Sequence, residues 1–477
     1  MPYENGRRSM KLLFVIGQKA LLRHYDTVVL ELINRGHTVR IASPDRTKVI
    51  ALPHRLRERP EVSEVSCPAG RSDAWDAPAR LFRGLRDYVR YLEPSYAQAT
   101  KLRQRALRHL VKAATGDEAQ SHIKMQCPHC RRVIRDEDWT LGLRRLTDQI
   151  RDTLPRLMNL AERALPVDPT VRAFIEAESP SIVIVTPLLN LGASQADFVH
   201  AARVLDIPVV FPVFSWDNLS NKGVIHAMPD RILVWNERQR QEATEWHGVP
   251  AERVIVTGAA RFDEFIAFAP SVDRAGFCER VGFRPDAAIL TYLGSSPFIA
   301  PDERGFVQQW IDRIRTATDA RLRDANIIVR PHPRARFKLR DAKSPGGDRI
   351  HLSLSDYANA DQALFDCLYY SDAAVGLNTS AEIEAALVGC PVYTIRTEQF
   401  ARGQEGTQHF RYLLSEQGGF VEATDSMEDH LAQLSQAVAG RFDRGRIEAF
   451  RRAFIRPYGY ERPATPRVVA AIEEMGG

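Results

Sequence analysis

A short apolar strand in the second half of the chain runs into a turn of small polar residues and then into a helix. The strand covers Ala373–Gly376, the turn holds Asn378, Thr379 and Ser380, and Glu384 lies one turn into the helix. Backbone N–H groups at such a turn, together with the helix N-terminus, suit an anion. A nearby carboxylate can accept hydrogen bonds from a ribose. The pattern predicts a sugar-nucleotide site, and the alternative is a plain βαβ unit in which Thr379 or Ser380 caps the helix.

Two more polar loops follow strands in this half of the chain. Arg330-Pro331-His332-Pro333 ends the apolar run Asn326–Arg330, and Gly294-Ser295-Ser296 ends another run that begins near residue 288. An arginine can fork onto a phosphate, and a histidine can donate to a phosphate oxygen and assist a departing nucleotide. Parallel strands bring their carboxyl ends to one edge of a sheet, where ligands bind. We therefore expect the three loops to form one site, although a rigid turn with a solvated His332 is the alternative for the second loop.

Candidates for a general base lie in the first half. His24 starts the first helix, where a capping or packing role is the alternative. Asp217 follows the strand Val209–Phe211, and it could instead serve turn chemistry. Trp216 would offer a stacking surface for a sugar, and Asn218 would help to shape the acceptor pocket. These neighbours favour Asp217 over His24 as the base.

The alternation of strands and helices predicts two doubly wound α/β domains facing each other across a cleft. We expect residues 1–255 to form the first domain and residues 256–450 the second. The Pro-Tyr-Gly break at Arg456–Gly459 marks a redirected helix, so residues 451–477 should return to the first domain. Residues 75–165 break the alternation and predict a helical insertion.

One helix of this insertion carries a stripe of arginines. They recur at helical spacing as Arg80, Arg83, Arg86 and Arg90. The simplest expectation is a solvated helix face, and the alternative is a surface for an anionic acceptor or for lipid headgroups.

The cysteines predict no disulfide framework. Cys278, Cys367 and Cys390 are expected to be small buried side chains. Cys127-Pro128-His129-Cys130 is a knuckle suited to a metal, but a structural zinc site usually takes four ligands from two such pairs, and the second pair is missing. A solvent-facing turn is favoured over zinc there. No Asp-x-Asp pair suits a metal–diphosphate site, so we expect metal-independent chemistry without a cofactor.

Charge and hydropathy narrow the class of protein. The 65 basic and 60 acidic residues give a net charge of +5, which is too weak a basic excess to argue for nucleic acid. It suits phosphorylated substrates or light contact with an anionic membrane surface. No apolar run approaches the ~20 residues of a membrane span, and Leu12–Ile16 is too short for a signal-peptide core. We expect a cytoplasmic protein, with peripheral contact to the inner face of the membrane as an option.

Several motifs together resemble glycosyltransferases of the two-Rossmann "GT-B" architecture, in the superfamily that also holds UDP-N-acetylglucosamine 2-epimerases and CDP-glycerol glycerophosphotransferases. The matching segments are VTGAARFDEF (256–265), IIVRPHP (327–333) and SDAAVGLNTSAEIEAALVGCPVYTI (371–395). SWDNLSNKG (215–223) and RPYGYERPATPR (456–467) resemble bacterial proteins of surface-polysaccharide assembly.

The resemblance implies that Glu384 binds the ribose, that Thr379 and Ser380 bind the phosphates, and that Arg330 and His332 bind the diphosphate or the departing nucleotide. The donor would be UDP-linked or CMP/CDP-linked, and the acceptor a glycan or a lipid-linked glycan. A glycerol-phosphate transferase, a sugar-nucleotide epimerase and a non-catalytic binding protein remain alternatives. The first turn, GQKALLRHYD (17–26), lacks the Arg-Pro-Glu signature of the epimerases, which counts against epimerisation.

Overall fold

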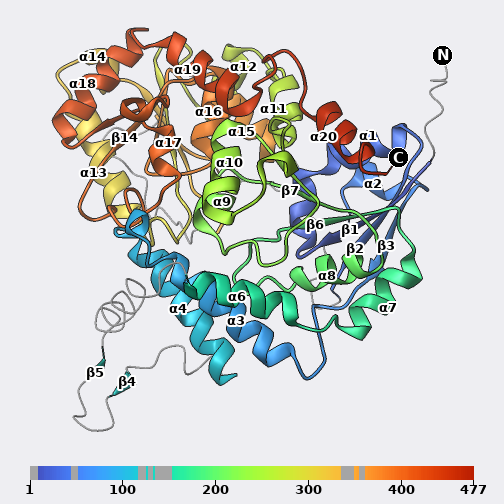
Figure 1. The fold of residues 1–477 in the computed structure, drawn as a ribbon. Coiled ribbons are helices and arrows are strands. Elements are labelled where there is room, and N and C mark those ends of the chain that lie inside the picture. The colour runs from blue at the N-terminus through green and yellow to red at the C-terminus, as the bar shows by residue number, and fades with distance from the viewer. Residues whose placement is uncertain are drawn as a thin grey trace. The chain divides into compact units, whose positions relative to one another are not determined.

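The computed structural model describes residues 9–44, 52–116, 125–126, 133–134, 153–334, 349–353 and 360–476. The chain forms two compact units. Unit 1 joins Met1–Asp263 to Phe454–Gly477, and unit 2 is Glu264–Ala453. Each unit is built on a parallel sheet with helices packed against it (Figure 1). The predicted α/β fold with two Rossmann-like domains is confirmed.

The sheet of unit 1 has seven parallel strands in the order β3-β2-β1-β6-β7-β8-β9. The strands are β1 (Lys11–Ile16), β2 (Thr38–Ser43), β3 (Val62–Ser66), β6 (Ile182–Thr186), β7 (Val209–Pro212), β8 (Arg231–Val234) and β9 (Val254–Val256). The chain first moves outward from β1 to β3 and then returns to pair β6 with the other side of β1. The strand order therefore reverses between β1 and β6, and such a switch point is where open α/β sheets bind ligands.

Helices cover both faces of this sheet. On β1, Phe14 points into a core with α1 and α20, whereas Val15 points into a core with α7 and α8, as the two-residue period of a strand requires. The helices of unit 1 outside the insertion are α1 (Asp26–Asn34), α2 (His54–Arg57), α7 (Pro169–Glu178), α8 (Ala196–Val204), α9 (Asn218–Asn221), α10 (Glu237–Gln241) and α20 (Thr465–Glu473).

The insertion is helical where the structure describes it. It contains α3 (Asp76–Arg90), α4 (Thr100–Thr115) and α6 (Thr153–Ala164), and two short antiparallel strands, β4 (Met125–Gln126) and β5 (Val133–Ile134), lie between α4 and α6. The knuckle of Cys127 and Cys130 lies outside the described residues.

The expectation that the arginine stripe of α3 is a solvated face was wrong for Arg83 and Arg90, which are buried, whereas Arg80 is exposed. Arg83 is 1% exposed and pairs with Glu162 on α6 and Asp197 on α8, each at 2.7 Å. Arg90 is buried and donates to the carbonyl oxygens of Lys222 and Gly223. The sequence places the arginines on one stripe but cannot show the carboxylates and carbonyls that distant segments bring to them. These contacts hold the insertion against the sheet domain.

Unit 2 has six parallel strands in the order β12-β11-β10-β13-β14-β15. The strands are β10 (Ile289–Leu293), β11 (Asn326–Arg330), β12 (Ile350–Leu352), β13 (Ala373–Gly376), β14 (Val392–Ile395) and β15 (Val421–Thr424). The order reverses between β10 and β13, so this sheet has its own switch point. The predicted bounds of β11 and β13 agree with the structure.

The helices of unit 2 pack on separate apolar clusters, one around Phe277 and a larger one around Trp310, which is fully buried and donates its indole N–H to His430. They are α11 (Asp263–Ala267), which begins at the last residue of unit 1, α12 (Arg274–Val281), α13 (Arg304–Arg315), α14 (Ala320–Arg323), α15 (Ala360–Tyr369), α16 (Ala381–Val388), α17 (Phe410–Leu413), α18 (Met427–Val438) and α19 (Arg444–Phe450). The prediction of buried cysteines is confirmed for Cys278, Cys367 and Cys390.

The end of the chain packs on the first sheet domain. The carboxylate of Asp263 accepts hydrogen bonds from the guanidinium of Arg456 (2.6 Å), the Ala464 amide (3.0 Å) and both the amide and the hydroxyl of Thr465 (2.7 Å each). It thereby fixes the start of α20, which lies against α1 (Figure 1). The two motifs at 256–265 and 456–467 thus meet within unit 1. In the described part of the chain, no helix is long and apolar enough to cross a bilayer.

Candidate functional site

Strand register brings the three predicted polar loops of unit 2 together. Leu293 of β10 pairs with Arg330 of β11 on one side and with Gly376 of β13 on the other. The loops after these strands therefore leave the sheet side by side at its carboxyl edge, on both sides of the switch point. The juxtaposition that the sequence predicted is present, although ligand binding by these loops stays a prediction.

Gly294 is the point at which two of these loops touch. A Cβ atom on Gly294 would lie 2.9 Å from the amide nitrogen of His332 and 3.0 Å from the Cα of Pro331. The Gly294 amide donates to the carbonyl oxygen of Arg330 at 2.8 Å. The residue must therefore be glycine for the stiff Pro-His-Pro loop to approach so closely.

In the turn after β13, Asn378 is buried and fixes the turn, whereas Thr379 and Ser380 are partly exposed. Asn378 is buried and donates to the carbonyl oxygen of Gly403 (2.9 Å) and the hydroxyl of Thr407 (3.0 Å), so its amide holds the turn in place. Thr379 and Ser380 are half-buried and directly precede α16, and Glu384 is half-buried on its first turn. The side chains that the sequence assigned to phosphate and ribose are thus partly accessible.

Arg330 and His332 are held by local contacts. The guanidinium of Arg330 donates to the Ser353 hydroxyl and the Ala360 carbonyl oxygen, each at 2.9 Å, so a phosphate would share it with these partners. The half-buried His332 accepts at Nδ1 from the amide of Arg334 at 3.0 Å. Accepting at Nδ1 places the proton of the neutral ring on Nε2, which makes Nε2 a donor.

A buried acidic cluster beneath the turn was not anticipated as a site feature. Glu382 on α16 is 0% exposed, and its carboxylate lies over Gly376, where a Cβ atom would be 2.5 Å from Oε1. Glu303, immediately before α13, is also buried and accepts from the Ser295 amide at 3.0 Å. Both carboxyls interact electrostatically with the buried Tyr292 of β10. The cluster supports two of the three loops from below.

Burial raises the pKa of both carboxyls. The pKa of Glu382 rises to about 8, mainly through desolvation and further through the charge of Glu303, while a backbone contact at Thr379 opposes the shift. Desolvation raises the pKa of Glu303 to about 7, against hydrogen bonds from Ser295. At pH 7 Glu382 is therefore largely protonated and Glu303 about half protonated, so the cluster carries less negative charge beside the N-terminus of α16 than two ordinary carboxylates would. That condition favours an anion at the turn.

The two candidate bases lie near each other in unit 1. His24, 8% exposed, stacks on Phe214 with 5.5 Å between ring centroids and 14° between ring planes. Burial lowers its pKa well below the usual value, helped by the charges of Arg261 and Arg23, so the ring is neutral at pH 7. The half-buried Asp217 lies three residues beyond Phe214 and accepts from the Ser215 hydroxyl at 2.6 Å. Neither geometry selects one base over the other.

Trp216 and Asn218 lie inside unit 1. Trp216 is 2% exposed and Asn218 is 1% exposed. The side-chain oxygen of Asn218 accepts from the Ser215 amide at 3.2 Å and closes the turn. Contact of either side chain with an acceptor would require this turn to open, and their acceptor-binding role stays a prediction.

A cavity of about 240 Å³ lies at the switch point of unit 1. Its walls come from the loops that follow β1, β2, β3 and β6, and its polar side chains are Asn190, Ser194 and Gln195. Gly17 makes room for Gln195, because a Cβ atom there would lie 2.3 Å from the amide nitrogen Nε2. Among the described residues that line it there is no aspartate, glutamate, histidine, lysine or arginine. The sequence signal for this cavity is only a glycine after the first strand.

Metal binding finds no support in the described residues, among which no group of three or more histidine, cysteine, aspartate or glutamate side chains is arranged to hold an ion. The possibility raised for Cys127 and Cys130 lies outside those ranges. Metal-independent chemistry stays a prediction.

No protein-family model matches the chain, and no curated protein is detectably similar to it. Solved structures are similar in fold. UDP-GlcNAc 2-epimerase from Methanocaldococcus jannaschii is 12% identical, with 98% of this chain and 100% of that chain covered and a TM-score of 0.52. A Listeria monocytogenes protein with a suggested identity as UDP-N-acetylglucosamine 2-epimerase is 13% identical, with 98% and 96% covered and a TM-score of 0.51. These similarities support the GT-B fold that the sequence predicted.

Proposed function

We propose that this protein is a glycosyltransferase that moves a sugar from a nucleotide-activated donor to a glycan or lipid-linked acceptor, in the assembly of a bacterial surface polysaccharide. The donor nucleotide binds at the carboxyl edge of unit 2, between the loops after β10, β11 and β13. The acceptor binds at the switch point of unit 1. Transfer needs no metal, because the N-terminus of α16 and the Nε2–H of His332 supply hydrogen-bond donors to the diphosphate.

We assign a role to each group of the two proposed sites. Thr379 and Ser380 bind the diphosphate, and Glu384 binds the ribose hydroxyls. His332 donates from Nε2 to the phosphate as the nucleotide departs, which stabilises the charge that develops there. Asp217 takes the proton from the acceptor hydroxyl, and His24 is the second candidate for that step.

The cavity of unit 1 is the observation that carries the proposal. Epimerisation at carbon 2 requires removal of a carbon-bound proton and therefore an acid–base group beside the sugar. The described lining of this cavity has amides and a hydroxyl, from Asn190, Ser194 and Gln195, but no carboxylate or imidazole. Such groups bind hydroxyls and hold them in place. This composition supports binding of a hydroxyl-rich acceptor, while the group that takes its proton, Asp217 or His24, lies outside this lining.

A sugar-nucleotide epimerase is the second candidate, because both structural neighbours with a TM-score above 0.5 are described as UDP-GlcNAc 2-epimerases. The two activities differ in products. A transferase releases nucleoside diphosphate or monophosphate only when an acceptor is present, whereas an epimerase converts the sugar nucleotide without an acceptor.

The test begins with a thermal-shift screen of UDP, CMP, CDP, GDP and dTDP, since a ligand that binds only the folded state raises the melting temperature. Sugar nucleotides of the base that stabilises the protein are then followed by NMR with and without pooled glycan and lipid-linked acceptors. Acceptor-dependent nucleotide release that is lost in Asp217→Asn supports the proposal. Formation of a C2 epimer without acceptor, or stabilisation by no nucleotide, would overturn it.

A further inference from the structure

A second cavity, of about 220 Å³, lies in unit 2 at the opposite end of the sheet from the nucleotide loops. It opens beside Pro391 and Val392, where β14 begins, and beside Phe420, which precedes β15. The nucleotide loops instead follow the ends of β10, β11 and β13. The cavity is therefore separate from the candidate site within the same unit.

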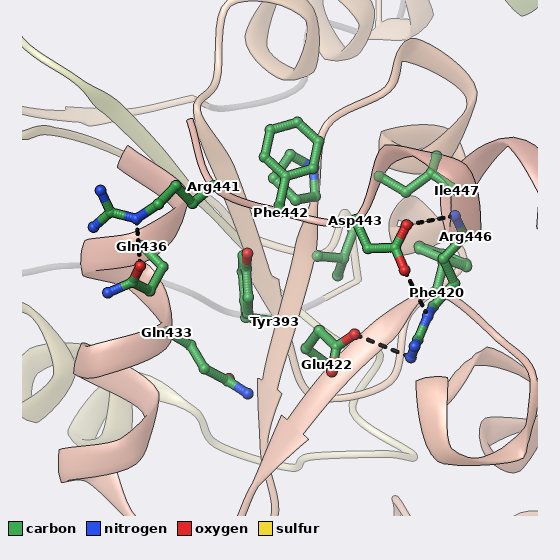
Figure 2. A pocket seen from close by; sticks show the side chains of 12 residues that line it. Tyr393, Phe420, Glu422, Gln433, Gln436, Arg441, Phe442, Asp443, Arg446 and Ile447 are labelled. Carbon is green, nitrogen blue, oxygen red and sulfur yellow. Dashed lines mark hydrogen bonds and ion pairs between the residues drawn. The ribbon is translucent and has the colours of Figure 1, made fainter. Parts of the chain in front are cut away.

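The floor of this cavity is a tyrosine whose hydroxyl lacks a partner. Tyr393 is 4% exposed, yet its hydroxyl is directed toward Phe442 in the cavity (Figure 2) and forms no hydrogen bond with the described residues. Burial and the charge of Glu422 raise its pKa far above 10, so the phenol remains a donor. The side-chain oxygen of Gln433, on α18, is likewise buried without a described partner. The Tyr393 hydroxyl is therefore open to the cavity and the Gln433 oxygen is buried beside it, so two polar groups are available to a polar ligand.

The charges around the cavity compensate one another. Arg446 contacts Glu422 at 3.2 Å and Asp443 at 3.5 Å, and Arg441 donates to Gln436 (Figure 2). The two arginines and two carboxylates of the lining balance, and Arg444 lies outside the lining with its guanidinium 4.8 Å from the centroid of the Phe442 ring. A phosphate would meet the carboxylates at short range, so the lining favours a neutral ligand over a nucleotide.

The size of the cavity and the groups that line it further limit the class of ligand. Drug-sized ligands occupy roughly 300–1,000 Å³, so this smaller cavity takes about one ring. The Tyr393 ring and the face of Phe442 that Arg444 does not cover are apolar, and planar amide, carboxylate and guanidinium groups surround them. A pyranose combines apolar C–H faces with a rim of hydroxyls that both donate and accept, and this lining satisfies both parts.

We propose that this cavity binds one neutral pyranose residue of a glycan, as a second carbohydrate site outside the nucleotide edge. The sugar ring packs against Phe442, and its hydroxyls bond to the Tyr393 hydroxyl and the Gln433 amide. The sugar site rests on this cavity alone. Its use in retaining the acceptor or product chain rests on the proposed function.

The test is saturation-transfer NMR on the full chain with neutral monosaccharides and their short oligomers, beside uridine, cytidine and sugar phosphates. We expect neutral sugars to bind, and Tyr393→Phe to weaken them about three- to tenfold, the effect of one lost hydrogen bond. Tyr369→Phe, at an exposed tyrosine of α15, removes a hydroxyl away from the cavity and should leave affinity unchanged.

Phe442→Ala provides a second variant on a half-buried loop side chain, and circular dichroism melts establish that each variant is folded. Absence of sugar binding, preference for nucleosides or phosphorylated sugars, or sugar binding that survives both Tyr393→Phe and Phe442→Ala would overturn the proposal. Nucleotide-induced thermal shifts should persist in both variants. Sugar binding without any transferase activity would reject the proposed function but keep this site.

Discussion

Glu382→Gln isolates the effect of a single buried proton. Glutamine keeps the shape of the side chain that lies over Gly376 but cannot ionise. In the folded protein the pKa of Glu382 is raised from 4.5 to about 8. A raised carboxyl pKa means that the folded state holds a proton which the unfolded chain releases. Stability is therefore complete below pH 4.5 and is lost as the pH rises toward 8.

The size of this effect follows from the shift. Each pKa unit corresponds to about 1.4 kcal/mol. As the pH rises from 5 to 7 the unfolded glutamate ionises while the folded one stays protonated, so Glu382 lowers the free energy of unfolding by about 2–3 kcal/mol over this interval. Glutamine does not ionise, so the variant does not lose this stability. We expect the stability of Glu382→Gln relative to the wild type to increase by about 2–3 kcal/mol as the pH rises from 5 to 7.

Urea denaturation at pH 5, 6, 7 and 8, followed by circular dichroism, measures the difference between the two proteins at each pH. Glu279→Gln, at an exposed position of α12, is the control and should follow the wild type throughout. If the difference between Glu382→Gln and the wild type is the same at every pH, Glu382 is ionised in the folded protein and the description of a protonated cluster is wrong.

Four further outcomes are expected. Glu384→Ala should weaken nucleotide binding by roughly 1–3 kcal/mol, the scale for hydrogen bonds to a charged group, and unchanged affinity by calorimetry would remove Glu384 from the site. His332→Ala should lower turnover by about 10²–10⁴-fold, whereas near-normal turnover would return its loop to a structural role. Asp217→Asn should abolish transfer and preserve nucleotide binding; if it stays active and His24→Ala is inactive, the two assignments are exchanged. Arg83→Ala should cost about 3–5 kcal/mol of unfolding free energy because it leaves buried carboxylates unpaired, and a urea midpoint equal to that of the wild type would contradict the burial of that network.

Strands with uninterrupted apolar sequence could be predicted, and two of the four edge strands could not. β11 and β13 lie inside the sheet and carry the buried runs that predict parallel strands. β3 (VSEVS) and β12 (IHL) are the edge strands beyond β2 and β11, and both were missed. An edge strand is covered on fewer sides, so its sequence keeps polar residues and a weaker signal.

In the candidate site, too, some features could be predicted from the sequence and others could not. The loops at 294, 330 and 378 could be found because each follows a predictable strand. Glu382 could not be separated from Glu384, since two carboxylates two positions apart on a helix point to different faces and only the tertiary structure decides which one is buried. The cavity at Tyr393 forms where α18 and α19 pack beside the starts of β14 and β15. No local sequence pattern predicts that packing.

The return of residues 454–476 to unit 1 affects how the protein is made. Unit 2 is continuous in sequence, whereas unit 1 is completed only when α20 has been synthesised. Domains generally fold during synthesis from the N-terminus onward, but here the second unit can finish first. Until Arg456 and Thr465 reach Asp263, that carboxylate and the apolar face of α1 stay uncovered on the ribosome. We therefore expect unit 1 to be completed only after unit 2 has been synthesised.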